Sequence, residues 1–364
     1  MWNIVKKWIE VRIGLDELVK TQLTEYLVPR NINLFYTLGF VALGGFVVQI
    51  ITGFFLLTYY VPHTDHAFKS VQDIMVNVPY GWLFRLMHVV GSNLIVASVG
   101  AHMLSVFFMN SYKKPRELTW LVGASMLLIT LTFCLSGYLL PWSQLSYWAT
   151  TIVTNIPSAI PSVGDFAVQM SRGGQNVSGA TLGRFFALHV GILPALLAGL
   201  LGTHLFLVRR IGISAPPFGP SKKEKNPWTA FRHEHHPDGH PFFPHFVLKE
   251  AAMVMAFFAV VFFVITFAPA LFSPEDASLP ADPFRTPAHI KPEWYFLAAY
   301  QMLKIVPNKF AGISLQIIIV TLFLFWPFLD TAKEDNILKR RVLLGLFLAA
   351  CLGWIVLTIW GKYS

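Results

Sequence analysis

Residues 85–104 read RLMHVVGSNLIVASVGAHML, an apolar stretch in which His88 and His102 lie 14 positions apart. Residues 184–208 read RFFALHVGILPALLAGLLGTHLFLV and place His189 and His204 15 positions apart in a second apolar stretch. In an α-helix, at about 1.5 Å and 100° per residue, each pair lies on one face with a separation of about 21–22 Å. The two stretches therefore predict two helices that carry matched histidines at two levels.

The composition around these stretches is that of an integral membrane protein. Of the 364 residues, 55% are hydrophobic and 13% are charged, about half the charged share of a soluble domain, and the mean hydropathy is +0.56. These values exclude a soluble globular enzyme and a disordered chain. The 2 cysteines, Cys134 and Cys351, lie in apolar runs and predict neither a disulfide framework nor a zinc site.

Stretches that lack Lys, Arg, Asp and Glu mark the candidate spans, because a span needs roughly 20 apolar residues. They cover residues 31–64, 86–112, 118–164, 185–208, 251–274, 310–329 and 342–361. Residues 118–164 could hold two spans, but the second half of this stretch contains Pro141, Pro157 and Pro161. That half is either an eighth span or an interfacial segment.

The distribution of basic residues favours the interfacial segment. With seven spans, one side of the membrane receives the N-terminal segment and residues 113–116, 209–249 and 333–341, which together hold 19 of the 28 Lys and Arg residues. The positive-inside rule makes this side cytoplasmic. We therefore predict an all-α integral membrane protein with seven transmembrane helices, a cytoplasmic N-terminus and a C-terminus on the outer side. The net charge of +9 reflects this orientation, so no nucleic-acid partner is expected.

The same pattern divides the chain into four regions. Residues 1–33 have the mixed charges and apolar spacing of an amphipathic helix on the inner surface. Residues 34–211 form a four-span bundle, and residues 212–246, rich in Pro, Lys and His, form an inner-side linker. Residues 247–364 form a three-span C-terminal half.

The four intramembrane histidines point to metal ligation. An ionisable residue within a span is costly and usually functional, and neutral imidazole is a good ligand for iron. Both helices run from outside to inside in the predicted topology, so His88 pairs with His189 near the outer face and His102 with His204 near the inner face. Two bis-imidazole centres would then lie across the membrane. The alternative is that each histidine forms a hydrogen bond between helices.

Glycines at the same spacing favour a large flat cofactor. Gly39 and Gly53 lie 14 positions apart in the first span, and Gly123 and Gly137 lie 14 positions apart in the third. Small residues let another body approach a helix closely, although glycines alone also serve ordinary helix packing.

Other basic residues have less specific assignments. Arg85 and Arg184 each precede an outer histidine and could pair with anionic groups such as haem propionates, or they could be arginines that reach the interface from a helix end. The histidine cluster at residues 233–245 has no spacing typical of structural zinc sites. A solvated loop or an inner-side proton antenna is the competing interpretation.

Two short strings complete the pattern. Residues 141–144 read PWSQ, and residues 292–295 read PEWY and are followed by Pro307-Asn308-Lys309. With the histidine and glycine pairs, these strings resemble the cytochrome b family of quinol–cytochrome c reductases over nearly the whole chain. The PEWY string is specific in this position, after a fifth span and behind this histidine set.

The resemblance implies a catalytic, proton-translocating oxidoreductase subunit of the respiratory electron-transport chain. Two b-type haems are implied, a low-potential one on His88 and His189 and a high-potential one on His102 and His204. Members of the family oxidise quinol near the outer face and pass one electron to a Rieske iron–sulfur protein. The other electron goes through the two haems to a quinone site near the inner face. The implied partners are the Rieske protein, a membrane-anchored c-type cytochrome, a second copy in a homodimeric core and the lipid bilayer.

The resemblance also implies two quinone sites. At the outer site Glu293 is expected as the proton acceptor, because a carboxylate can take up a phenolic proton. The residues expected around it are Tyr138, Pro141, Trp142, Pro292, Trp294 and Tyr295. At the inner site the matching positions are Arg209, Lys249 and Glu250. Positive-inside charges at span ends are an equal alternative for this second set.

The branch within the family is mixed. The step from His189 to His204 and the residue Arg209 resemble the cytochrome b6f branch, whose members usually split this chain in two and attach an extra haem through a Cys before the first span. Here Thr37 occupies that region, so a covalent third haem is not expected, and a noncovalent one stays open. Ala149 replaces a glycine of many bc1 members. The fused form favours a bacterial cytoplasmic membrane.

Two other classes compete with this interpretation. A dihaem membrane anchor of a hydrogenase or formate dehydrogenase would lack residues 292–295 and the three-span half. A transporter with polar histidines in its core would bind no haem. Independent features of both halves favour the cytochrome b interpretation.

Overall fold

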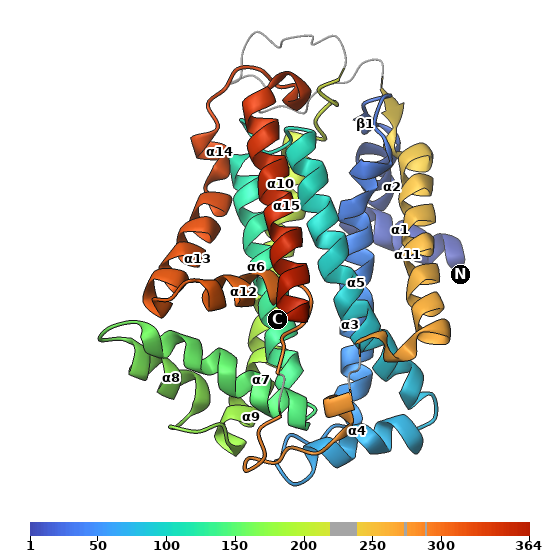
Figure 1. The fold of residues 1–364 in the computed structure, drawn as a ribbon. Helices are drawn as coiled ribbons and strands as arrows, with labels where there is room; N and C mark the ends of the chain where they lie inside the picture. The colour runs from blue at the N-terminus through green and yellow to red at the C-terminus, as the bar shows by residue number, and fades with distance from the viewer. Residues whose placement is uncertain (219–238, 273–274, 288–289) are drawn as a thin grey trace.

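Six long apolar helices dominate the computed structural model, which describes residues 1–218, 239–272, 275–287 and 290–364. The long helices are α3 (Leu38–Tyr59), α5 (Gly81–Phe108), α6 (Glu117–Leu139), α10 (Leu193–Ile211), α11 (Val247–Phe267) and α15 (Arg341–Tyr363). They run side by side in Figure 1. By length and composition all six can cross a membrane, as the sequence predicts.

The expected seventh span is shorter than the others. Helix α13 ends at Leu324, and the four-residue helix α14 (Trp326–Leu329) follows after Phe325. Pro327 lies in the first turn of α14, where a missing N–H is tolerated, but it cannot continue α13. The apolar stretch at 310–329 is therefore a 16-residue helix, α13 (Lys309–Leu324), with a broken end.

The second half of residues 118–164 does not form a span. Helix α6 ends at Leu139, and the chain then forms two short helices, α7 (Gln144–Asn155) and α8 (Gly164–Arg172). The 12 residues of α7 rise only about 18 Å. These helices lie with α4 (Ala67–Val76) and α9 (Gly179–Ala187) at the bottom end of the molecule (Figure 1). This part of the chain therefore provides no eighth long apolar helix.

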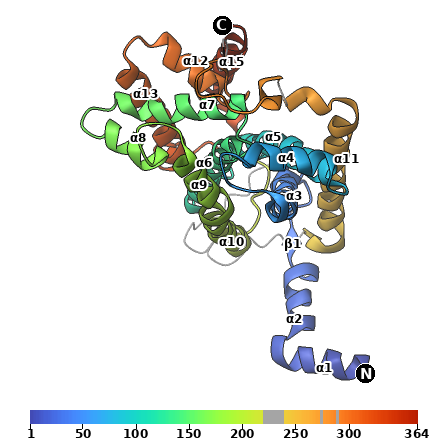
Figure 2. The ribbon, with the colours of Figure 1, turned by 90° about the horizontal axis from the view of Figure 1, so that it is seen from below.

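The amphipathic stretch expected over residues 1–33 is divided into separate helices instead of one. The chain forms α1 (Trp2–Ile13) and α2 (Leu15–Val19), which are separated by Gly14 in the left-handed conformation, φ +62°. Glycine adopts this conformation without strain, so it ends α1. Figure 2 shows α1 and α2 extending away from the helical bundle. Strand β1 (Leu27–Val28) then pairs with β2 (His240–Pro241), inside the stretch predicted as a linker.

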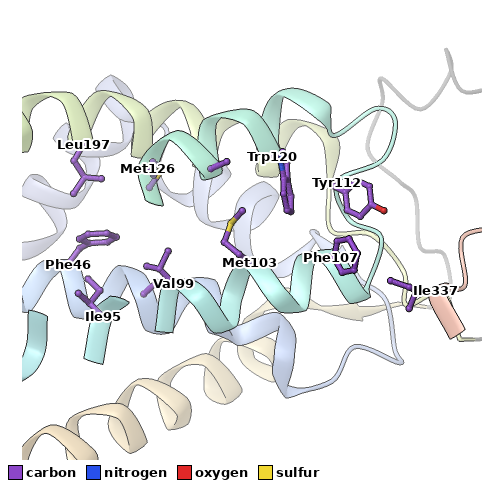
Figure 3. Packing of buried hydrophobic residues seen from close by; sticks show 12 residues of the cluster. Phe46, Ile95, Val99, Met103, Phe107, Tyr112, Trp120, Met126, Leu197 and Ile337 are labelled. Atoms are coloured by element: carbon purple, nitrogen blue, oxygen red, sulfur yellow. The ribbon is translucent and has the colours of Figure 1, made fainter. Parts of the chain in front are cut away.

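The core of the first half lies between four helices. Helix α3 packs along α5, and α6 packs along α10. Figure 3 shows part of this core, with Phe46, Val99, Met103, Trp120 and Leu197 converging from the four helices. In a membrane such contacts stabilise the fold mainly through close packing, because lipid tails are as apolar as the side chains.

A buried ionic cluster connects the two halves. The Asp330 carboxylate, whose side chain is 2% exposed, accepts a hydrogen bond of 2.8 Å from Arg340 and another from the Tyr112 hydroxyl. Lys113 lies 4.0 Å away. Burial alone would raise the pKa of Asp330, but the bonds from Arg340 and Tyr112 and the nearby positive charges lower it overall. The cluster ties the end of α5 to the segment between α14 and α15.

Candidate functional site

The four histidines meet in two pairs, as their spacing predicts. His88 projects from α5, and His189 lies in a π-helical turn (Leu188–Ile192) between α9 and α10. The ring centres of His88 and His189 are 6.3 Å apart with an interplanar angle of 71°. His102 and His204, one level away, also lie close enough to interact electrostatically. Single π turns in α-helices often occur at functional sites.

Each predicted glycine lies against one of these rings. A Cβ atom would lie 3.4 Å from the His88 ring at Gly53 and 2.6 Å from the His189 ring at Gly137. It would lie 3.1 Å from the His102 ring at Gly39 and 3.1 Å from the His204 ring at Gly123. Because these four residues lack a Cβ atom, each imidazole ring can pack directly against the helix backbone.

The spacing of the outer pair fits a metal ion between the two rings. Two metal–nitrogen bonds of about 2 Å place imidazole centres about 6 Å apart, close to the 6.3 Å found here. No cluster of three or more His, Cys, Asp or Glu side chains among the described residues could hold a metal ion. Each pair can thus supply two ligands to a metal ion, and any further ligands would come from outside these histidines.

The outer and inner rings differ in their partners. The Nδ1 atom of His88 lies 2.9 Å from the Thr52 hydroxyl, and that of His189 lies 3.0 Å from the Ser136 hydroxyl. The Nδ1 atoms of His102 and His204 are buried without a hydrogen bond of good geometry. Thr52 and Ser136 were not predicted as site residues, although each directly precedes a predicted glycine.

The two predicted arginines have different surroundings. Arg184 donates to the carbonyl oxygens of Met170 and, at 3.1 Å, Gln169, so helix α8 already holds its guanidinium. Arg85 forms no hydrogen bond to any side chain or carbonyl in residues 1–218 or the other described ranges, and it lies near His88. Only Arg85 is therefore free of protein partners there.

Glu293 lines a small pocket at the C-terminal end of α6. The walls are formed by Cys134, Leu135, Tyr138, Ala149, Thr150, Val153, Pro292, Tyr295 and Phe296. The cavity measures about 20 Å³, room for about one water molecule, so a quinol ring can enter only if side chains move. Burial raises the pKa of the Glu293 carboxyl to about 7. A carboxyl with this pKa can exchange protons near neutral pH.

Two side chains that the sequence analysis did not assign hold the loop that carries Glu293. The Trp294 indole N–H donates to the Asn93 amide oxygen at 3.0 Å, which links the loop to α5 five residues after His88. Cys134 of α6 lies against Tyr295 in the wall of the same pocket. Neither Asn93 nor Cys134 belongs to a motif, so sequence spacing gave no sign of them.

The string at residues 141–144 turns the chain after α6. Trp142 has a positive φ of 51° and is buried, and Ser143 caps α7. The Gln144 side chain accepts a hydrogen bond of 2.7 Å from the Asp282 N–H and donates to the Arg285 carbonyl oxygen. The turn therefore fixes the segment that leads to Pro292.

The three predicted inner-site residues are not joined by contacts. Arg209 lies 3.6 Å above the Tyr26 ring and donates to the Gln22 side chain at 2.8 Å. Glu250 is buried, whereas Lys249 is exposed. In the part of the chain that the structure describes, Arg209, Lys249 and Glu250 form no hydrogen bond or ion pair with one another.

Part of the predicted histidine cluster lies outside the described residues, namely His233, His235 and His236. His240 and His245 stack with ring centres 5.3 Å apart.

Thr37, at the position discussed for a covalent haem, is fully buried, and its hydroxyl donates to the Leu34 carbonyl at 2.7 Å.

Comparison with known proteins identifies the family. Residues 23–212 match the family described as cytochrome b/b6/petB, and residues 280–364 match its C-terminal companion, cytochrome b(C-terminal)/b6/petD. The chain belongs to the cytochrome b family. This cytochrome b is 38% identical over 353 residues to cytochrome b of Rhodospirillum rubrum, covering 96% of this chain and 84% of that protein. It is 39% identical over 354 residues to cytochrome b of Rickettsia prowazekii, covering 96% and 85%.

A solved structure agrees with these relatives. A chain of a hyperthermophilic respiratory complex III superimposes with a TM-score of 0.89 at 39% identity, covering 98% of this cytochrome b and 91% of that chain. A protein of Bradyrhizobium diazoefficiens described as cytochrome b/c1 is 36% identical over 353 residues, which are 96% of this chain and 50% of that protein. This chain thus carries both regions in one fused polypeptide and is the cytochrome b subunit of a quinol:cytochrome c oxidoreductase, respiratory complex III. The family implies b-type haems.

Proposed function

We propose that this cytochrome b holds two b-type haems, one between His88 and His189 and one between His102 and His204. The observation that carries this proposal is the 6.3 Å spacing of the outer rings, each seated against a glycine. Bound haems supply one-electron transfer at two levels of the membrane. Arg85, free of protein partners among the described residues, is the candidate for a propionate contact, whereas Arg184 would have to leave the α8 carbonyls to make one.

Quinol oxidation is assigned to the pocket at Glu293. The carboxylate accepts a proton from the quinol, and its pKa of about 7 suits this step because it can then release the proton to water. Tyr138 and Tyr295 form the pocket wall with Pro292, and Trp294 anchors the loop. Pro141 and Trp142 hold the turn behind it.

Quinone reduction is assigned to the inner side, with Arg209, Lys249 and Glu250 as candidates for binding the quinone carbonyl and supplying protons. Buried Glu250 supports this assignment most directly, because it makes no hydrogen bond or ion pair with any described residue. Arg209 takes part only if it leaves the contacts with Gln22 and Tyr26.

The seventh crossing is assigned to Lys309–Leu329, the joint length of α13 and α14. These 21 residues rise about 31 Å, enough to cross the hydrocarbon core. Seven crossings place the N-terminus in the cytoplasm of a bacterium and the C-terminus outside. A Rieske protein and a membrane-anchored c-type cytochrome are the proposed electron acceptors, and the core is a homodimer.

A haem count tests the central claim. A reduced-minus-oxidised spectrum of the purified complex, with a pyridine haemochrome count, should give two b haems per chain that reduce in two steps. His88→Leu should remove one of them and leave the other. A well-folded complex without haem would overturn the proposal, and a third haem of another type would revise the inner site.

A further inference from the structure

The two histidine pairs differ in the hydrogen-bonding groups at their Nδ1 atoms. Both rings that face α6 lie near a backbone carbonyl four residues before their glycine, Phe133 for His189 and Thr119 for His204. Each outer ring has in addition a side-chain hydroxyl at Nδ1, and each inner ring has none among the described residues.

The sequence encodes this difference in dipeptides. The outer glycines follow a hydroxyl residue, in Thr52-Gly53 and Ser136-Gly137. The inner glycines, 14 positions earlier in the same helices, follow an apolar residue, in Leu38-Gly39 and Val122-Gly123.

The hydroxyl protons are already used, which fixes the direction of the bonds to histidine. The Thr52 hydroxyl donates to the Val48 carbonyl at 2.7 Å, and the Ser136 hydroxyl donates to the Phe133 carbonyl at 3.1 Å. Thr52 and Ser136 are each only 1% exposed, so bulk water does not reach them. Each oxygen therefore accepts the Nδ1–H of its histidine, which leaves Nε2 free to ligate a metal.

We propose that the Thr52 and Ser136 hydroxyls hold the reduction potential of the outer haem below that of the inner haem. The proposal rests on the proposed function, in which the histidine pairs ligate two haems. An imidazole that donates Nδ1–H to an acceptor becomes a more basic ligand and stabilises the oxidised iron. The outer site has two such bonds to hydroxyls, so it gives up its electron more readily than the inner site.

Redox titration of the two b haems in the purified complex tests this. Thr52→Val and Ser136→Ala should each raise the reduction potential of the low-potential haem and leave that of the high-potential haem unchanged. For a one-electron couple, a tenfold change in the equilibrium constant corresponds to about 59 mV. Thr52→Ser keeps the hydroxyl and should retain the wild-type value. Thr132→Val is the matched control, because the Thr132 hydroxyl donates to the Leu128 carbonyl at 2.8 Å and contacts no histidine.

A gain-of-function variant protects the test against misfolding. Val122→Thr introduces a hydroxyl before the inner Gly123 and should lower the high-potential step alone. Unchanged potentials in Thr52→Val and Ser136→Ala with full haem content would overturn the proposal, as would an equal shift of both haems. If Thr52→Val loses its haem, the test falls to Val122→Thr. An unchanged reduction potential of the inner haem in Val122→Thr would then overturn the proposal. Absence of two b haems in the wild type would instead refute the proposed function.

Discussion

The surroundings of Glu293 change the acidity of its carboxyl group. Burial raises the pKa of its carboxyl to about 7, so the proton-accepting carboxylate forms only as the pH rises through this value. We expect quinol oxidation to increase with pH up to about 7.5 and then to level off. Glu293→Gln should remove this dependence and lower the turnover about 10²–10⁴-fold, the usual contribution of a general base.

Pre-steady-state reduction of the haems by quinol, measured from pH 5.5 to 8.5, checks this prediction. Glu334→Gln serves as the control, because this carboxylate lies in the loop near Lys113 and Asn336, outside the pocket. A Glu293→Gln variant with the wild-type pH profile would assign the proton acceptor to another group.

Gly137 has the least room of the four glycines that face histidines. A Cβ there would lie 2.6 Å from the His189 ring, so Gly137→Ala must push the ring out of place. We expect the variant to lose the outer haem and keep the inner one, as counted by pyridine haemochrome. Gly353→Ala in α15, where a Cβ would meet no atom within 4 Å, should retain both haems. Equal haem content in the two variants would contradict the role of Gly137.

Ala149 lines the pocket that also contains Glu293. Its methyl group occupies space that a glycine would leave open to inhibitors of quinol oxidation. Ala149→Gly should increase the affinity for such inhibitors by about tenfold, which corresponds to about 1.4 kcal/mol. Titration of turnover with inhibitor checks this, and an inhibitor of the inner quinone site should bind both proteins equally. Full sensitivity of the unmodified protein would contradict the prediction.

Sequence reasoning at the residue level was good for spacing and poor for partners. Periodicity placed His88 opposite His189 because helical geometry is regular. The contacts of Arg209 with Gln22 and Tyr26 could not be predicted, because they join segments that lie about 190 positions apart in the sequence. The same limit applies to the bond between Asn93 and Trp294.

At the level of elements, apolar length predicted the long helices correctly and failed where one residue interrupts a helix. Pro327 divides the last part of the seventh apolar stretch, and Gly14 divides the N-terminal amphipathic stretch. Both residues were visible in the sequence. Their effect depends on local backbone conformation, which hydropathy does not describe.

The ionic cluster at Asp330 fixes the segment between α14 and α15. Asp330→Asn would leave Arg340 buried without its partner, and breaking such a pair costs about 3–5 kcal/mol. We expect a lower Tm of the detergent-solubilised complex, with little change at Asp335→Asn, whose side chain is 64% exposed. Because the folded-state pKa of Asp330 is lowered, its contribution is complete above the unfolded value of about 3.9 and is lost as the pH falls through the folded value. An Asp330→Asn variant with the wild-type Tm would exclude this role.

The orientation of the whole molecule across the membrane is predicted by the distribution of basic residues in the sequence. Helix packing alone does not predict it. The two ends of the chain should lie on opposite sides of the membrane. In a variant without Cys134 and Cys351, Lys7→Cys should react with an impermeant maleimide only in inside-out vesicles, and Ser364→Cys only in right-side-out vesicles. Labelling of both positions from one side would contradict seven crossings.

Each of the two proposed haem sites takes one histidine from α5 and the other from about 100 residues later in the chain. At roughly 5–20 residues per second, the ribosome therefore needs about 5–20 s between the two. During this interval the imidazoles of α5 lack their partner histidines, His189 and His204. Neither site exists until the fourth long helix has been inserted, so cofactor loading must follow insertion of the whole first half. Haem content is consequently a readout of completed biogenesis as well as of redox capacity.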